Sequence, residues 1–89
     1  MKKQKIIWYS VKGDGMPTPE IIERTKGLFL CSVKTTYLKD ESVTAINTVA
    51  AFIKNGEFLN TSFEKLSHSS SNSFIARVVA WAELPMYEE

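Results

Sequence analysis

The sequence has few of the residues that usually carry chemistry, with one cysteine and one histidine among 89 residues. Cys31 cannot close an internal disulfide, whereas secreted domains of this size usually depend on disulfides for stability. One cysteine and one histidine cannot complete a zinc site, and the carboxylates lack the spacing of a calcium loop. We therefore expect a cytoplasmic protein that binds no metal and no other cofactor.

An excess of charge and long apolar runs are also missing. Eleven basic residues stand against ten acidic ones, which gives a formal net charge of +1 at pH 7, so the charge does not indicate a nucleic-acid partner. No apolar run approaches the roughly 18 residues of a membrane helix. The apolar residues 6–9 after the basic start are too few for a signal peptide. The length and the 44% hydrophobic content predict one small globular domain over residues 1–89, without a membrane partner.

The N-terminal third predicts one strand and one short helix. Residues 5–11 are rich in β-branched and aromatic side chains, and the turn formers Gly13-Asp14-Gly15 should end that strand. Thr18 can act as the N-cap of a short helix that runs through Arg24, with Pro19 in its first turn.

The centre of the chain predicts a β-hairpin. Residues 28–37 alternate between apolar and polar side chains, which indicates a half-buried strand. Residues 42–54 fit either a helix capped by Ser42 or a strand, because apolar spacing and β-branched residues coexist there. Asn55-Gly56 is typical of a two-residue type I′ turn and favours strands on both sides, although Gly56 could also cap a helix.

The C-terminal third predicts a loop and a last strand. The serine-rich segment 67–73 lacks an apolar anchor and reads as a mobile loop or a wide turn. Residues 74–82 alternate, with even-numbered side chains on one face and odd-numbered ones on the other, and should be buried on much of both faces. The whole chain predicts a mainly β fold, a small antiparallel sheet or barrel of about four to five strands with one short helix.

Both ends of the chain resemble one family. Trp8-Tyr9-Ser10-Val11-Lys12, followed by Met16-Pro17, resembles the Trp-Ile-Ser-Val-Lys-Asp-Arg-Leu-Pro opening of a family of short phage and prophage proteins, the domain-of-unknown-function family five-five-one. Residues 79–85 resemble that family's closing Thr-His-Trp-Met-Pro-Leu-Pro. The turn at residues 13–15 is longer than usual, Ala80 replaces the family's histidine and Glu83 replaces a proline. The resemblance implies a phage or mobile-element origin and a bacterial host cell, and it assigns no chemistry.

The candidate residues for a site favour binding over catalysis. His68 lies in the serine-rich segment, which is too polar to hold catalytic geometry, and Cys31 lies on the apolar face of a predicted strand and should belong to the core. Arg77 lies between apolar neighbours on the last strand, where an inward guanidinium would need a glutamate or an anionic ligand, the glutamate being the favoured partner. Trp8 and Trp81 could stack on a nucleobase or fill the core, and core packing is favoured for at least one of them.

These residues lead to three hypotheses. The first is a non-enzymatic phage protein that counters host defence by sequestering a nucleotide-type signal or by capping a host protein. Its ligand site would use Arg77 with Trp8 or Trp81, and the segment around His68 and Ser70 would close over it, between subunits of a homo-oligomer. The second is a structural or adaptor module, such as a minor virion part, recognisable by an exposed apolar strand edge. The third and least favoured is a hydrolase that uses His68.

Overall fold

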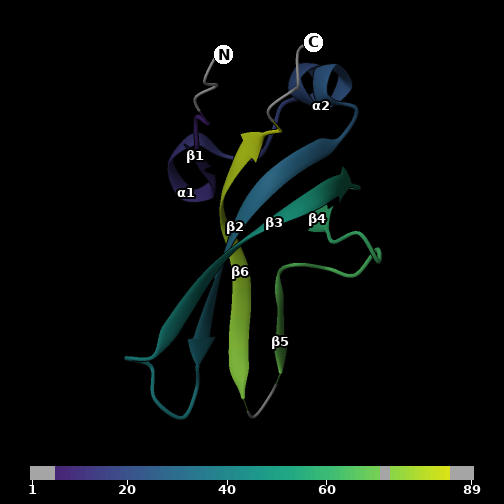
Figure 1. Cartoon of the computed structure of the whole chain (residues 1–89). Coiled ribbons are helices and arrows are strands. Elements are labelled where there is room, and N and C mark those ends of the chain that lie inside the picture. Colours follow the sequence, from purple (N-terminus) through teal and green to yellow (C-terminus); the bar gives the residue numbers. More distant parts are fainter. Residues whose placement is uncertain (1–5, 71–72, 85–89) are drawn as a thin grey trace, which may run out of the picture.

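A single antiparallel sheet forms the protein in the computed structural model, which describes residues 6–70 and 73–84 (Figure 1). The elements follow one another as β1 (Tyr9–Ser10), α1 (Val11–Asp14), α2 (Pro19–Thr25), β2 (Leu28–Tyr37), β3 (Thr44–Lys54), β4 (Glu57–Leu59), β5 (His68–Ser70) and β6 (Phe74–Glu83). The strand order is β1-β6-β2-β3-β4, and β5 pairs with the other end of β6. The mainly β prediction is confirmed, as an open sheet with six strands instead of a closed barrel.

The N-terminal strand is shorter than predicted. Only Tyr9 and Ser10 pair with β6, and a helical turn begins at Val11. The Ser10 side chain accepts a hydrogen bond from the Gly13 amide at 3.2 Å, and the Asp14 carboxylate accepts the Ser10 amide at 2.9 Å. Local hydrogen bonds of this capping type compete with strand pairing, so Gly13 and Asp14 lie in a helix and Gly15 ends it with φ +78°.

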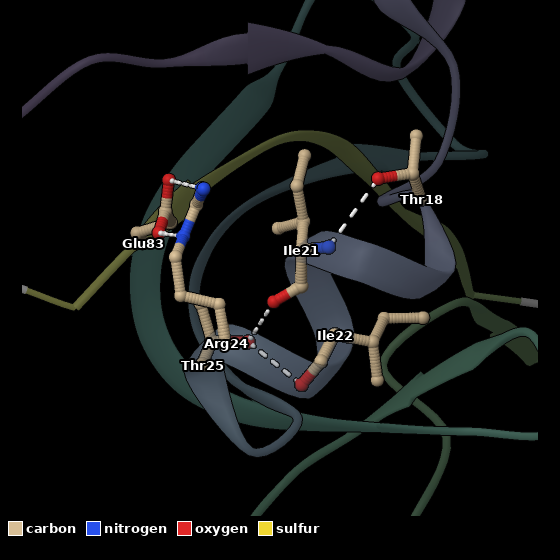
Figure 2. A network of polar contacts seen from close by, with 6 residues as sticks. All are labelled: Thr18, Ile21, Ile22, Arg24, Thr25 and Glu83. Carbon is tan, nitrogen blue, oxygen red and sulfur yellow. Dashed lines mark hydrogen bonds and ion pairs between the residues drawn. The ribbon is translucent and has the colours of Figure 1, made fainter.

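The short helix α2 confirms the prediction for residues 18–24. The Thr18 side chain caps it by accepting the Ile21 amide at 3.3 Å, and Thr25 donates its hydroxyl to the Ile21 carbonyl at 2.8 Å (Figure 2). Arg24 donates to both carboxylate oxygens of Glu83 on β6, at 3.1 and 2.8 Å (Figure 2). This bidentate contact joins the end of the helix to the end of the last strand.

The central hairpin is as predicted. β2 pairs with β3 in one continuous register, with Cys31 opposite Val49 and Thr36 opposite Thr44. Asn55 and Gly56 both have positive φ, +52° and +77°, as a type I′ turn requires. The helical alternative for residues 42–54 is therefore wrong, because the turn and the pairing with β2 decide the conformation.

The last strand departs from strict alternation because it contains a bulge. The β2–β6 register shifts between Ser32 and Val33, so that Ser32 lies opposite Ala80 and Val33 opposite Val78. Ala76 and Val78 face the core before the shift, and Trp81 faces it afterwards. The even-and-odd face assignment for residues 74–82 is thus correct only up to Val78.

Part of the serine-rich segment forms a strand, in contrast to the predicted loop. His68 to Ser70 form β5 and pair with Phe74 to Ala76 of β6, while residues 71–72 lie outside the described part. The Ser67 hydroxyl accepts the Val78 amide at 3.0 Å, beside the bulge. Backbone pairing to a strand does not need apolar side chains, and this is why composition alone did not reveal β5.

The core lies on one face of the sheet. Its centre is Phe29 and Cys31, both 0% exposed, and Phe29 packs edge to face against Phe58 and Trp81. Val11 of α1 and the two isoleucines of α2 pack against the same cluster. Both helices therefore cover the core side of the sheet. In the part of the chain that the structure describes, no helix has the length and apolar character needed to cross a membrane.

Candidate interaction surface

The two tryptophans have different environments. Trp81 is 2% exposed, its ring stacks on Tyr9 at 4.6 Å, and its indole nitrogen donates to the Gly15 carbonyl at 2.9 Å. Core packing of at least one tryptophan is thereby confirmed, and Trp81 presents no free face to a nucleobase. Trp8 precedes β1 and is 40% exposed.

Arg77 is exposed, so the prediction that the last strand is buried on much of both faces is wrong at this position. From Phe74 to Val78, β6 is buried on one face only, and Arg77 lies directly opposite Lys34 on the other face. Trp81 faces the core and lies opposite Cys31, three residues along β2 from Lys34, so it is about 10 Å further along the sheet than Arg77. The structure therefore does not bring Arg77 and Trp81 to one site. The glutamate contact expected for Arg77 is made by Arg24 instead, with Glu83.

His68 is exposed on β5, and its ring packs edge to face against Phe74 at 5.4 Å. The side chain of Ser70 lies outside the described part of the structure. Cys31 is completely buried, as predicted, and burial raises the pKa of its thiol to about 12. Among the described residues, no group of three or more histidine, cysteine or acidic side chains could hold a metal ion.

Two hollows lined by described residues are small. One of about 190 Å³ lies between the helix side and the β3–β4 hairpin, lined by residues such as Met16, Phe58 and Val78. A second, of about 270 Å³, lies beside Asn60 and His68. Pockets for small ligands usually span about 300–1,000 Å³. Neither hollow contains Arg77 or a tryptophan.

The face of the sheet opposite the core carries the even-numbered side chains of β2 and β3, and we call it the outer face. At the end of this face near the β2–β3 turn, Lys34 lies between Ile46 on β3 and Arg77 on β6. Like charges directly opposite each other on a sheet are unfavourable, and neither cation has an ion pair with another described residue. Ile46 and Ile75 flank this cation pair and are 65% and 45% exposed.

An aromatic pair lies at the other end of the outer face. Phe63 is 70% exposed and stacks on Phe52 with ring centres 5.8 Å apart. Its φ of +62° is rare for a bulky residue. The Asn60 side chain holds this loop by accepting the amides of Ser62 and Glu64 at 2.8 and 3.0 Å.

The open edge of β3 is the most distinctive feature of this surface. β4 pairs only with Phe52 to Lys54, so the stretch from Thr44 to Ala51 has no strand on its outer side among residues 6–70 and 73–84 (Figure 1). Within β3 the only charged residue is Lys54, at its end, and the strand contains no proline. Lysine, proline and bulges are the usual protections of an edge strand, so this edge is unprotected.

The hydrogen-bonding direction along β3 follows from two bonds. Ile53 donates to the Gly27 carbonyl at 2.9 Å and Tyr37 donates to the Val43 carbonyl at 3.2 Å, and each bond joins residues directly opposite in the register. Hydrogen-bonded pairs alternate along an antiparallel ladder, so the odd-numbered residues of β3 bond to β2. The even-numbered ones direct N–H and C=O to the open side, namely Thr44, Ile46, Thr48 and Ala50.

The sequence reasoning did not single out the residues of this edge. The sequence feature that marks this edge is the run from Val43 to Ile53, eleven residues without charge, proline or glycine. The same run was the one that fitted either helix or strand, and its position at an edge depends on the strand order, which no local pattern specifies.

Comparisons with known proteins yield no relative for this chain. No family model, no curated protein and no solved structure matches it. The resemblance of both chain ends to the phage family therefore stays a prediction.

Proposed function

We propose that this chain is a non-enzymatic interaction module that holds a strand of another polypeptide against the open edge of β3. The observation that carries the proposal is the outward direction of the backbone groups from Thr44 to Ala50. Strand addition uses such groups for affinity and alternate side chains for specificity. The binding partner is accordingly an extended polypeptide segment.

Two further features support a binding role. Cys31 is a buried core thiol with a raised pKa, about 12, so its nucleophilic thiolate is disfavoured. The outer face beside the open edge offers exposed Ile46 and the cations Lys34 and Arg77 to a partner. A partner segment on β3 would place alternate side chains next to Ile46 and Thr48.

The biological setting that we propose comes from the resemblance of the chain ends. A phage or mobile-element protein with this edge would act in the bacterial cytoplasm and counter host defence by capping a host protein. The lone cysteine is in keeping with a reducing compartment.

A peptide library tests the strand-addition proposal. Extended peptides of alternating polar and apolar residues are selected for binding to the folded protein, and each binder is measured against Thr48→Pro. Proline removes the outward N–H and obstructs the edge, but leaves the ladder to β2, which uses odd-numbered residues, intact. We expect binding to be lost in Thr48→Pro and kept in the control Thr48→Val. Peptides that bind equally to all three proteins would refute the proposal.

A second candidate function is the sequestering of a nucleotide-type anion. One observation favours it, the juxtaposition of Lys34 and Arg77 on the outer face without an acidic partner in the described part of the chain. A bound phosphate would relieve their repulsion. Thermal unfolding with a panel of nucleotides tests this candidate. A stabilisation that disappears in Arg77→Met would support it, and no stabilisation by any nucleotide would exclude it.

A further inference from the structure

The open edge of β3 fits a second copy of this chain, an inference that rests on the proposed strand addition and names the partner. We propose that two copies pair their β3 strands antiparallel about a two-fold axis beside Asn47, so that both sheets join into one. In each copy the outward residues of β3 supply the hydrogen bonds of this pairing.

The position of the axis follows from the limits of the open stretch. With Asn47 on the axis, Thr44 lies opposite Ala50 of the other copy and Ile46 opposite Thr48. All four are outward-directed positions, so every free N–H and C=O between Thr44 and Ala50 finds a partner. No described strand competes for these groups in the single chain.

Neighbouring registers satisfy fewer groups. An axis beside Thr48 would place Thr44 opposite Phe52, whose outward groups face β4 through its pairing with Leu59. An axis beside Ile46 would place Ala50 opposite Ser42, which lies in the turn before the strand. The Asn47 register alone uses the full open edge of both copies.

Charge does not oppose this pairing. The strand is uncharged up to Ile53, so self-pairing brings no like charges together along its length.

Self-pairing gives a reason for the missing edge protection. An uncharged edge strand without proline is a template for uncontrolled aggregation unless something covers it. A two-fold pairing closes both edges at once and cannot propagate through them. A host strand would then bind by displacing the second copy.

A cysteine at the axis tests the register. Two Asn47 residues form a non-hydrogen-bonded pair, with Cα atoms about 4.5 Å apart, within the range of a disulfide. Asn47→Cys should form a covalent dimer on mild oxidation, seen on a non-reducing gel. The matched control Thr44→Cys should not, because the two copies of residue 44 lie about 20 Å apart in this register. Native Cys31 is buried and does not interfere. Equal cross-linking of both variants would overturn the register.

Charge exchange tests the dimer itself in a way that misfolding cannot imitate. Ile46→Lys with Thr48→Lys places lysines opposite each other across the axis, and Ile46→Glu with Thr48→Glu does the same with glutamates. We expect the wild-type protein to have twice the chain mass by light scattering and each charged variant to be a monomer. An equimolar mixture of the two variants should recover the dimer, because lysine then faces glutamate.

The outcomes separate this inference from the proposed function. A monomeric wild-type protein in which the Thr48 amide exchanges rapidly, and gains protection with a selected peptide, would overturn self-pairing and keep strand addition. A monomer in which that amide is already protected would refute both, since the edge would be covered from within the chain.

Discussion

Replacing Trp81 with alanine should be among the most destabilising single changes in this protein. The side chain is 2% exposed, stacks on Tyr9, packs edge to face against Phe29 and donates to the Gly15 carbonyl. Truncation of a buried tryptophan costs about 3–5 kcal/mol. Within that sum the hydrogen bond accounts for about 1 kcal/mol, and the stacked ring pair for about 0.5–1.5 kcal/mol. A small domain has about 5–15 kcal/mol in total, so Trp81→Ala can approach complete unfolding.

Two companion variants make the measurement informative. Trp81→Phe keeps an aromatic ring beside Phe29 and loses the indole donor and part of the volume, for an expected cost of about 1–3 kcal/mol. Trp8→Ala removes a tryptophan that is 40% exposed and should cost about 1 kcal/mol or less. The assay is urea unfolding followed by circular dichroism, with m-values compared between variants. If Trp81→Ala and Trp8→Ala cost the same, the assignment of Trp81 to the core is refuted.

Three further outcomes are expected. Ser42→Ala should raise the pKa of Asp40 part of the way towards its ordinary value, because it removes the hydroxyl bond, which lowers that pKa most, and keeps the bond from the backbone amide; NMR titration of the carboxyl checks this. Because its pKa is lowered, the ionised Asp40 carboxyl stabilises the fold at pH values above the ordinary pKa of aspartate, and this contribution is lost as the pH falls through the pKa in the folded state. Cys31 should resist alkylation at pH 8 until the protein is denatured. Because burial raises the pKa of the thiol to about 12, the protonated thiol contributes to the stability of the fold, fully at pH values below the thiol's unfolded pKa and less as the pH rises towards about 12. Asn60→Ala should cost about 1–2 kcal/mol in urea unfolding and release Phe63, whereas Asn60→Asp keeps the acceptor oxygen and should cost less.

Elements specified by local chemistry could be predicted from the sequence. The cap Thr18 and the turn Asn55-Gly56 each define a backbone conformation by their own side chains or φ angles. The alternation of residues 28–37 identified β2 with its observed bounds. Cys31 was placed in the core for the same reason, because it shares the apolar face of that strand.

Features that depend on long-range pairing could not be predicted. The last strand was expected to be buried on much of both faces because its residues are mostly apolar, but from Phe74 to Val78 it has the core on one face only, and Arg77 lies on the other. The bulge opposite Ser32 and Val33 arises between strands far apart in the chain, and it moved Trp81 to the core face. The open edge of β3 could not be predicted either, because which strand lies at an edge depends on the strand order, and no local pattern specifies that order.

The bulge in β6 also determines which changes in gene length the strand can absorb. The two residues between Val78 and Trp81 include the extra one that carries the strand from one side-chain parity to the other. Loss of a single codon there would leave a regular strand in which Val78 and Trp81, now two positions apart, still face the core opposite Val33 and Cys31. Glu83 would keep its position relative to Trp81 and with it the contact to Arg24. A single deletion should therefore be tolerated better between residues 78 and 81 than inside β2, which has no extra residue to lose.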